Sequence, residues 1–103
     1  MSRVVLDAKR VGEVRSYSFD FTSALGTTET ISTKSVTAAV YSGTDASPST
    51  IISGSASSSG SIVTQKITTG IAGVIYGLTC TVTTSLGQTL VLMAFLAVIP
   101  DLI

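Results

Sequence analysis

The sequence predicts an all-β protein: a single antiparallel β-sandwich of about seven short strands with an N-terminal arm. Several short segments alternate between apolar and polar residues, with the period of two that a half-buried strand requires. Charged residues make up only 12% of the 103-residue chain, whereas Ser, Thr, Gly and Val are abundant. This composition favours strands and turns over helices.

The length of the chain allows one modest core, so we expect a single sandwich domain over residues 13–103. Residues 1–12 mix charged and apolar side chains without a clear period, which predicts an extended arm. Such a segment can add to the free sheet edge of a neighbouring subunit and become ordered only on assembly. Its candidate interface residues are the apolar ones: Val4, Val5, Leu6 and Val11.

The first clear strand is predicted over residues 13–21, where Tyr17, Phe19 and Phe21 share one face and contribute much of the core volume. A turn at 22–26 is followed by a short strand at 29–34, anchored by Ile31, and by an alternating strand at 34–41. A long turn at 42–49 then leads to a brief strand at 51–52 and to a solvated Ser/Gly loop at 53–61. The last predicted segments before the hairpin are a strand at 62–68 and a corner at 69–73.

The central feature is a predicted hairpin over residues 71–99. Its first strand has an apolar face made of Val74, Tyr76, Leu78, Cys80 and Val82. Gly87 is suited to the positive φ of the turn. We expect the single cysteine, Cys80, to be a buried, unreactive thiol, because it lies among the inward residues and the chain has no histidine.

The second strand of the hairpin, residues 90–98, is apolar on both faces. It lies within a segment, residues 67–100, that has no charged residue. One face must cover the core, and the other must be covered by a folded-back terminus or by another protein. The candidate interface residues on this strand are Val91, Met93 and Phe95, and a homo-oligomer is one expected outcome.

The corner before the hairpin is similar to the approach to strand F in immunoglobulin-like and fibronectin-like domains. Gly70, Gly73 and Tyr76 carry this similarity, since a tyrosine hydroxyl bonds back across the corner in those domains. Here the tyrosine precedes Cys80 by four residues, and the chain has no second cysteine and no tryptophan. The resemblance is therefore to the general sandwich and not to antibody domains.

The order of these features resembles a group of small phage virion structural proteins. The resembling segments are Val14-x-x-Tyr17-x-Phe19-Asp20-Phe21, Ile31-Ser32, Ser35-Val36-Thr37, Gly43-Thr44-Asp45-Ala46-Ser47-Pro48 and residues 72–88. The resemblance implies a virion protein assembled in the host cytoplasm, which binds the major capsid protein or other virion proteins. It implies a capsid cement or decoration protein, with a neck or tail component as the alternative.

Other function classes lack the residues they need. Without histidine, a G-x-S-x-G motif or a P-loop, we expect no enzymatic activity, no cofactor and no small-molecule substrate. The carboxylates are scattered, so no metal site is predicted. The formal net charge of zero argues against nucleic acid. The apolar run at 90–99 is shorter than the about twenty residues of a membrane helix. A receptor- or carbohydrate-binding module remains a further alternative, with Tyr41 as its one free aromatic platform.

Overall fold

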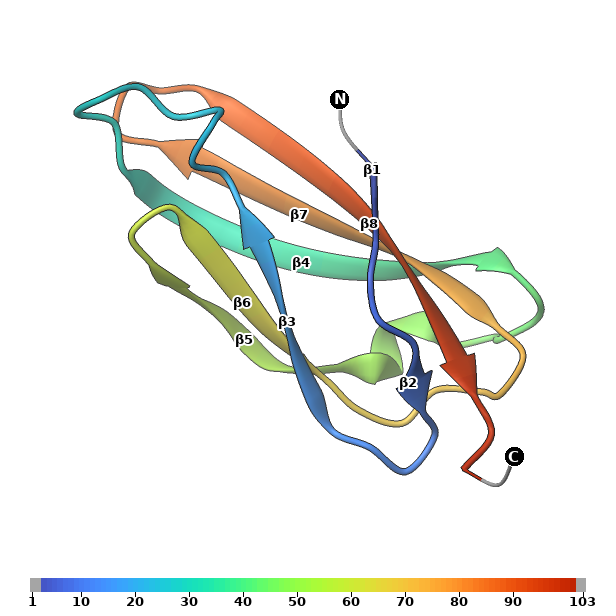
Figure 1. Cartoon of the computed structure of the whole chain (residues 1–103). Coiled ribbons are helices and arrows are strands. Elements are labelled where there is room, and N and C mark those ends of the chain that lie inside the picture. The colour runs from blue at the N-terminus through green and yellow to red at the C-terminus, as the bar shows by residue number, and fades with distance from the viewer. Residues whose placement is uncertain (1–2, 102–103) are drawn as a thin grey trace.

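The computed structural model describes residues 3–101, with side chains from Leu6 onwards. It contains two packed β-sheets (Figure 1), which confirms the predicted sandwich. The larger sheet has the strand order β1-β8-β7-β4, with β2 also paired to β8, and the smaller sheet has the order β3-β6-β5. The molecule is elongated, measuring 46 × 21 × 20 Å. The elements are β1 (Arg3–Val5), β2 (Lys9–Arg10), β3 (Arg15–Asp20), β4 (Ile31–Ser42), the 3₁₀-helix η1 (Pro48–Ile51), β5 (Ile52–Ser59), β6 (Ile62–Ile67), β7 (Ile75–Thr84) and β8 (Thr89–Ile99).

The core lies between the two sheets and is built from alternate residues of their strands. On β3 and just after it, the predicted aromatic face is buried: Tyr17, Phe19 and Phe21 are at most 5% exposed. The predicted inner face of the hairpin's first strand is buried throughout, from Val74 to Val82, and includes Cys80. Both predicted faces are therefore confirmed.

Strand β8 has one face in the core and one face outside it. Ala94, Leu96 and Val98 are buried, whereas the alternate residues are only half-buried. The sequence could not distinguish these faces, because both are apolar. The antiparallel register with β7 determines which face lies in the core, since it places Leu96 beside the buried Tyr76.

Two predicted strands over residues 29–41 are a single twelve-residue strand, β4. The predicted division at Lys34 was wrong. Strand β4 pairs along its length with β7, with register shifts between Ile31 and Thr33 and between Val40 and Ser42. The long ladder supplied by β7 keeps the segment extended, although its polar residues give only a weak strand pattern.

The predicted Ser/Gly loop at residues 53–61 was also wrong, because residues 52–59 form strand β5. Its pairing with β6 contains a bulge: from Ser53 to Ser57, β5 advances four residues while β6 advances two, from Lys66 to Thr64. The side chain of Gln65 lies opposite this bulge and forms hydrogen bonds with the backbone of β5. Gln65 Nε2 donates to the carbonyl oxygens of Ser53 and Gly54 at 3.0 and 3.2 Å.

The N-terminal segment lies on its own chain. Strands β1 and β2 both run parallel to β8 and pair with it (Figure 1). Between and after these strands, the backbone nitrogen of Leu6 donates to the Phe95 carbonyl at 2.9 Å, and that of Val11 donates to the Ile99 carbonyl at 3.1 Å. The edge that receives this segment therefore belongs to the same subunit, and not to a neighbouring subunit as the sequence pattern had indicated.

Candidate interaction surface

The larger sheet has an outer face, which points away from the core. Its position follows from the register, because residues that pair across β4, β7 and β8 point to the same side. Thr37, Thr79 and Met93 form one such row. The outer face is made of Thr33, Ser35, Thr37, Ala39 and Tyr41 from β4, Ile75, Gly77, Thr79, Thr81 and Thr83 from β7, and Thr89, Val91, Met93, Phe95, Ala97 and Ile99 from β8.

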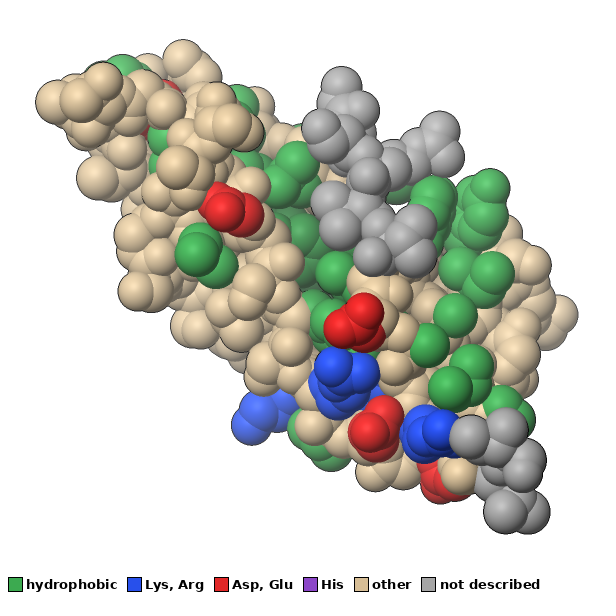
Figure 2. Space-filling model, in the orientation of Figure 1, with side chains coloured by type: hydrophobic (Ala, Val, Ile, Leu, Met, Phe, Trp, Pro, Cys, Tyr) green, Lys and Arg blue, Asp and Glu red, His purple; other side chains and the backbone are tan. Residues whose placement is uncertain are grey.

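None of these outer-face residues is charged. The outer side of the smaller sheet differs, since it carries Asp20 and Lys66 in exposed positions. In Figure 2, hydrophobic side chains follow the line of β8, whereas acidic and basic side chains gather where β2 and β3 begin. An uncharged and partly apolar sheet face is typical of a protein-binding surface.

Tyr41 and Phe95 form an aromatic pair on this face. Their ring centroids are 4.4 Å apart with an interplanar angle of 40°, and Tyr41 is 62% exposed. The register explains the contact: Gly77 lies between Ala39 on β4 and Phe95 on β8. Because glycine has no side chain, the rings can meet above it. The sequence pattern marked Tyr41 as a free aromatic but could not indicate its partner.

The structure divides the seven predicted interface residues into separate groups. Val91, Met93 and Phe95 lie on the outer face, half-buried in the single chain. Leu6 and Val11 pack against the core and are partly covered. Val4 and Val5 pair through their backbones with Ala94 and Phe95, and their side chains lie outside the described residues.

Lys9 has a structural role that its sequence context did not predict. Its side chain is fully buried. Its ammonium donates to three carbonyl oxygens: Arg10 at 2.8 Å, Val11 at 3.1 Å and Thr69 at 2.6 Å. Burial lowers the pKa of Lys9 from its usual value, while nearby carboxylates act in the opposite direction. Since three donors meet three acceptors, this cation fastens β2 to the 69–73 corner.

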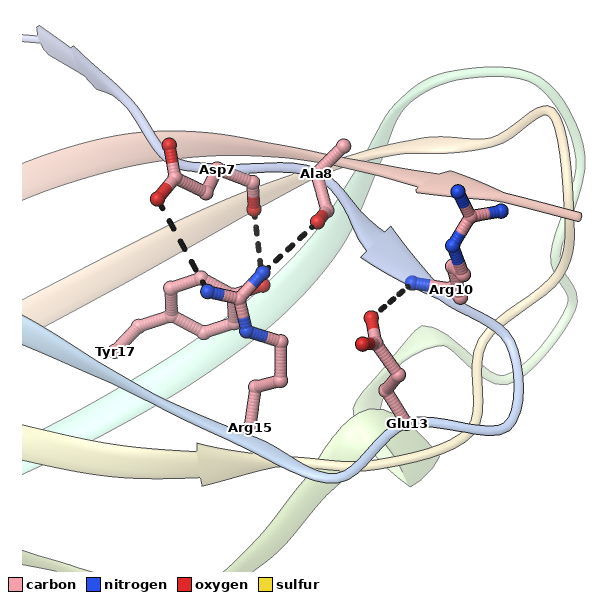
Figure 3. Close-up of polar contacts among 6 residues, drawn as sticks. All are labelled: Asp7, Ala8, Arg10, Glu13, Arg15 and Tyr17. Carbon is pink, nitrogen blue, oxygen red and sulfur yellow. Dashed lines mark hydrogen bonds and ion pairs between the residues drawn. The ribbon is translucent and has the colours of Figure 1, made fainter. Parts of the chain in front are cut away.

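Polar contacts of Asp7 and Ala8 fasten the N-terminal segment to β3 (Figure 3). Tyr17 Oη donates to the Asp7 carbonyl at 2.9 Å, and Arg15 Nη1 donates to the Ala8 carbonyl at 3.1 Å. The backbone nitrogen of Arg10 donates to Glu13 Oε1 at 2.8 Å. The charged groups near β2 and the start of β3 therefore form bonds within the chain. The outer face is thus the stronger candidate for binding a partner protein.

The described residues offer little that suggests other kinds of site. Burial raises the pKa of the Cys80 thiol to about 11, so it stays protonated and unreactive near neutral pH. Within residues 3–101, no three His, Cys, Asp or Glu side chains are grouped to hold a metal ion. In that same part of the chain, no helix has the length and apolarity to span a membrane.

Comparison with known proteins gives one family. Residues 9–96 match the family described as podophage GP4 fiber-tail adaptor protein gp77. Comparisons with curated proteins and with solved structures return no match. The family match supports a phage structural protein of the virion, and it favours the neck or tail alternative over capsid cement. Because the match covers most of the sequence, the chain belongs to the podophage fiber-tail adaptor family of phage structural proteins.

Proposed function

We propose that this chain is a non-enzymatic adaptor at the junction of tail and fibre, and that the outer face of β4, β7 and β8 is one of its binding surfaces. The family supports the position in the virion. The observation that carries the choice of surface is the absence of charged residues from the outer face.

The chemistry of the outer face suits protein contact. Burying a charged side chain is costly unless it finds a partner, whereas threonine hydroxyls and apolar side chains lose little when a matching surface covers them. The Tyr41–Phe95 pair adds rigid aromatic area, of the kind that often dominates binding energy. The partner that binds the outer face is another virion protein. Whether the free chain associates with itself is a separate question, which light scattering can answer.

The immunoglobulin-like character of the sandwich is part of this proposal. Its support is the strand order, with β3-β6-β5 facing β8-β7-β4, together with the corner at Tyr76. There the backbone nitrogen of Ile71 donates to the Tyr76 hydroxyl at 3.0 Å. A tyrosine that bonds a few residues upstream at this corner is a feature of such domains.

The test places a charge on the outer face and measures incorporation into virions. Met93→Lys and Phe95→Asp alter half-buried positions on the outer side of β8. Ser16→Lys is the matched control for Met93→Lys, because it adds the same charge at an exposed position on the smaller sheet. We expect all three variants to keep a β-type circular dichroism spectrum, and only the two β8 variants to be lost from particles.

Copy number separates the adaptor from capsid cement. Quantitative mass spectrometry of purified particles should give a copy number of this chain per particle close to that of the tail proteins. A copy number close to that of the major capsid protein would instead support cement.

Normal incorporation of both β8 variants would move the interface away from the outer face. Their unfolding would show that this side of β8 is needed for stability.

A further inference from the structure

An open groove of about 490 Å³ lies between the edges of β4 and β5. It is lined by residues 32–36 of β4, by Ile52 and residues 54–56 of β5, and by Gln65 of β6. Within residues 3–101, each of the two edge strands has a neighbouring strand on one side only: β4 pairs with β7, and β5 pairs with β6. The groove is therefore bounded by two strands with free backbone edges, which is where an added strand can pair.

Gln65 provides an independent indication that something binds in this groove. Its side chain is 1% exposed. Its amide nitrogen donates to three carbonyl oxygens, those of Ser53, Gly54 and Lys66, so this end must be the NH₂ group. The oxygen Oε1, at the other end, is buried and has no hydrogen-bond partner among the described residues. Buried acceptors are rarely left unpaired in native proteins.

Lys34 indicates the charge of the occupant. It is exposed and is the one charged residue among those that line the groove. Its partner across the ladder, Val82, is buried, so Lys34 extends from the core side of β4 towards the gap between the sheets. The described residues provide no carboxylate within ion-pair distance of its ammonium. A second copy of β4 would bring another lysine, so an acidic partner is favoured over self-pairing.

We infer that the groove receives an extended, acidic segment of another virion protein as an added strand. Backbone hydrogen bonds form along β4, a donor of the incoming segment bonds to Gln65 Oε1, and a carboxylate pairs with Lys34. The partner being a virion protein rests on the proposed adaptor function. An adaptor must hold two bodies, and this groove supplies a second binding surface on the same molecule as the outer face.

Hydrogen exchange tests the inference whichever virion protein supplies the added strand. Amide exchange of this chain is measured by mass spectrometry in purified virions and in the free protein. Residues 32–36 should exchange at least about tenfold more slowly in virions, because added-strand hydrogen bonds along β4 protect amides that are open in the free chain. Equal exchange in the two states would mean that the groove holds solvent only, and would overturn the inference.

Charge reversal provides the second arm of the experiment. Lys34→Glu should abolish the extra protection in the groove. Lys66→Glu is the matched control, since Lys66 is exposed on β6 and does not line the groove. Protection that survives Lys34→Glu would contradict an acidic partner strand. The adaptor proposal fails differently: the copy number of this chain per particle would then match that of the major capsid protein, whatever the exchange of residues 32–36.

Discussion

The hydroxyl of Tyr76 donates a 2.6 Å hydrogen bond to Asp45 Oδ2. Tyr76 is fully buried at the start of β7, and Asp45 lies in the turn that follows β4. The same hydroxyl accepts a hydrogen bond from the backbone nitrogen of Ile71. One oxygen therefore connects the 69–73 corner to the loop between β4 and η1, and so holds together two parts of the chain that are distant in sequence.

Tyr76→Phe should destabilise the fold by about 2 kcal/mol, at about 1 kcal/mol for each internal hydrogen bond, because it removes both contacts of the hydroxyl. Urea denaturation of the purified variant measures the loss. Tyr41→Phe is the control, since Tyr41 is exposed, and its midpoint should stay at the wild-type value. An unchanged midpoint for Tyr76→Phe would mean that water replaces both partners without cost.

Stability should decline in acid, in part through Glu29. Its carboxylate accepts hydrogen bonds from the backbone nitrogen of Gly26 and from the Thr84 hydroxyl. These bonds lower the pKa of Glu29 below its ordinary value of 4.5. The bond from Tyr76 lowers the pKa of Asp45 in the same direction. A lowered carboxylate pKa contributes stability above the ordinary value, and the contribution is lost as the pH falls through the folded-state pKa.

Glu29→Gln isolates this contribution. The denaturation midpoint of the variant should be lower than that of the wild type at about pH 7. The two midpoints should converge as the pH falls below about 4. A difference that is constant from about pH 7 to about pH 3 would show that the charge of Glu29 is not the relevant feature.

Lys9→Met should be strongly destabilising, with a loss of at least about 2 kcal/mol, because it leaves three carbonyl oxygens without their buried donor. Lys34→Met is the control, since Lys34 is exposed and its loss should leave the midpoint almost unchanged. Deletion of residues 2–12 removes the same contacts and should lower the melting temperature. An unaltered melting temperature would show that the N-terminal segment is a dispensable arm, as its sequence pattern suggested.

The Cys80 thiol should react with a disulfide reagent only after unfolding, because it is fully buried and its pKa is raised to about 11. Absorbance assays of thiol release, with and without denaturant, measure this. Cys80→Ser should cost more stability than Cys80→Ala, since a buried hydroxyl needs a hydrogen-bond partner. Rapid reaction of the native protein would contradict the burial of Cys80.

Local patterns in the chain were enough to predict the sandwich class and its clearest strands. Alternation identified the buried faces of β3 and β7, and Gly87 marked the turn between β7 and β8, where it takes a φ of 81°. These features depend on neighbouring residues alone, because the period of two places apolar side chains on one side whatever the partner strand is.

Contacts between distant segments account for the features that were not predicted. Strand β5 is mostly Ser and Gly, so its extended form comes from pairing with β6 and from the amide of Gln65. The core face of β8, apolar on both sides, was fixed by its register with β7. The contact of Tyr41 with Phe95 needed the register of three strands. Lys9 carried no sign of burial in the sequence, because its three acceptors are backbone carbonyls and one of them, on Thr69, is 60 residues away.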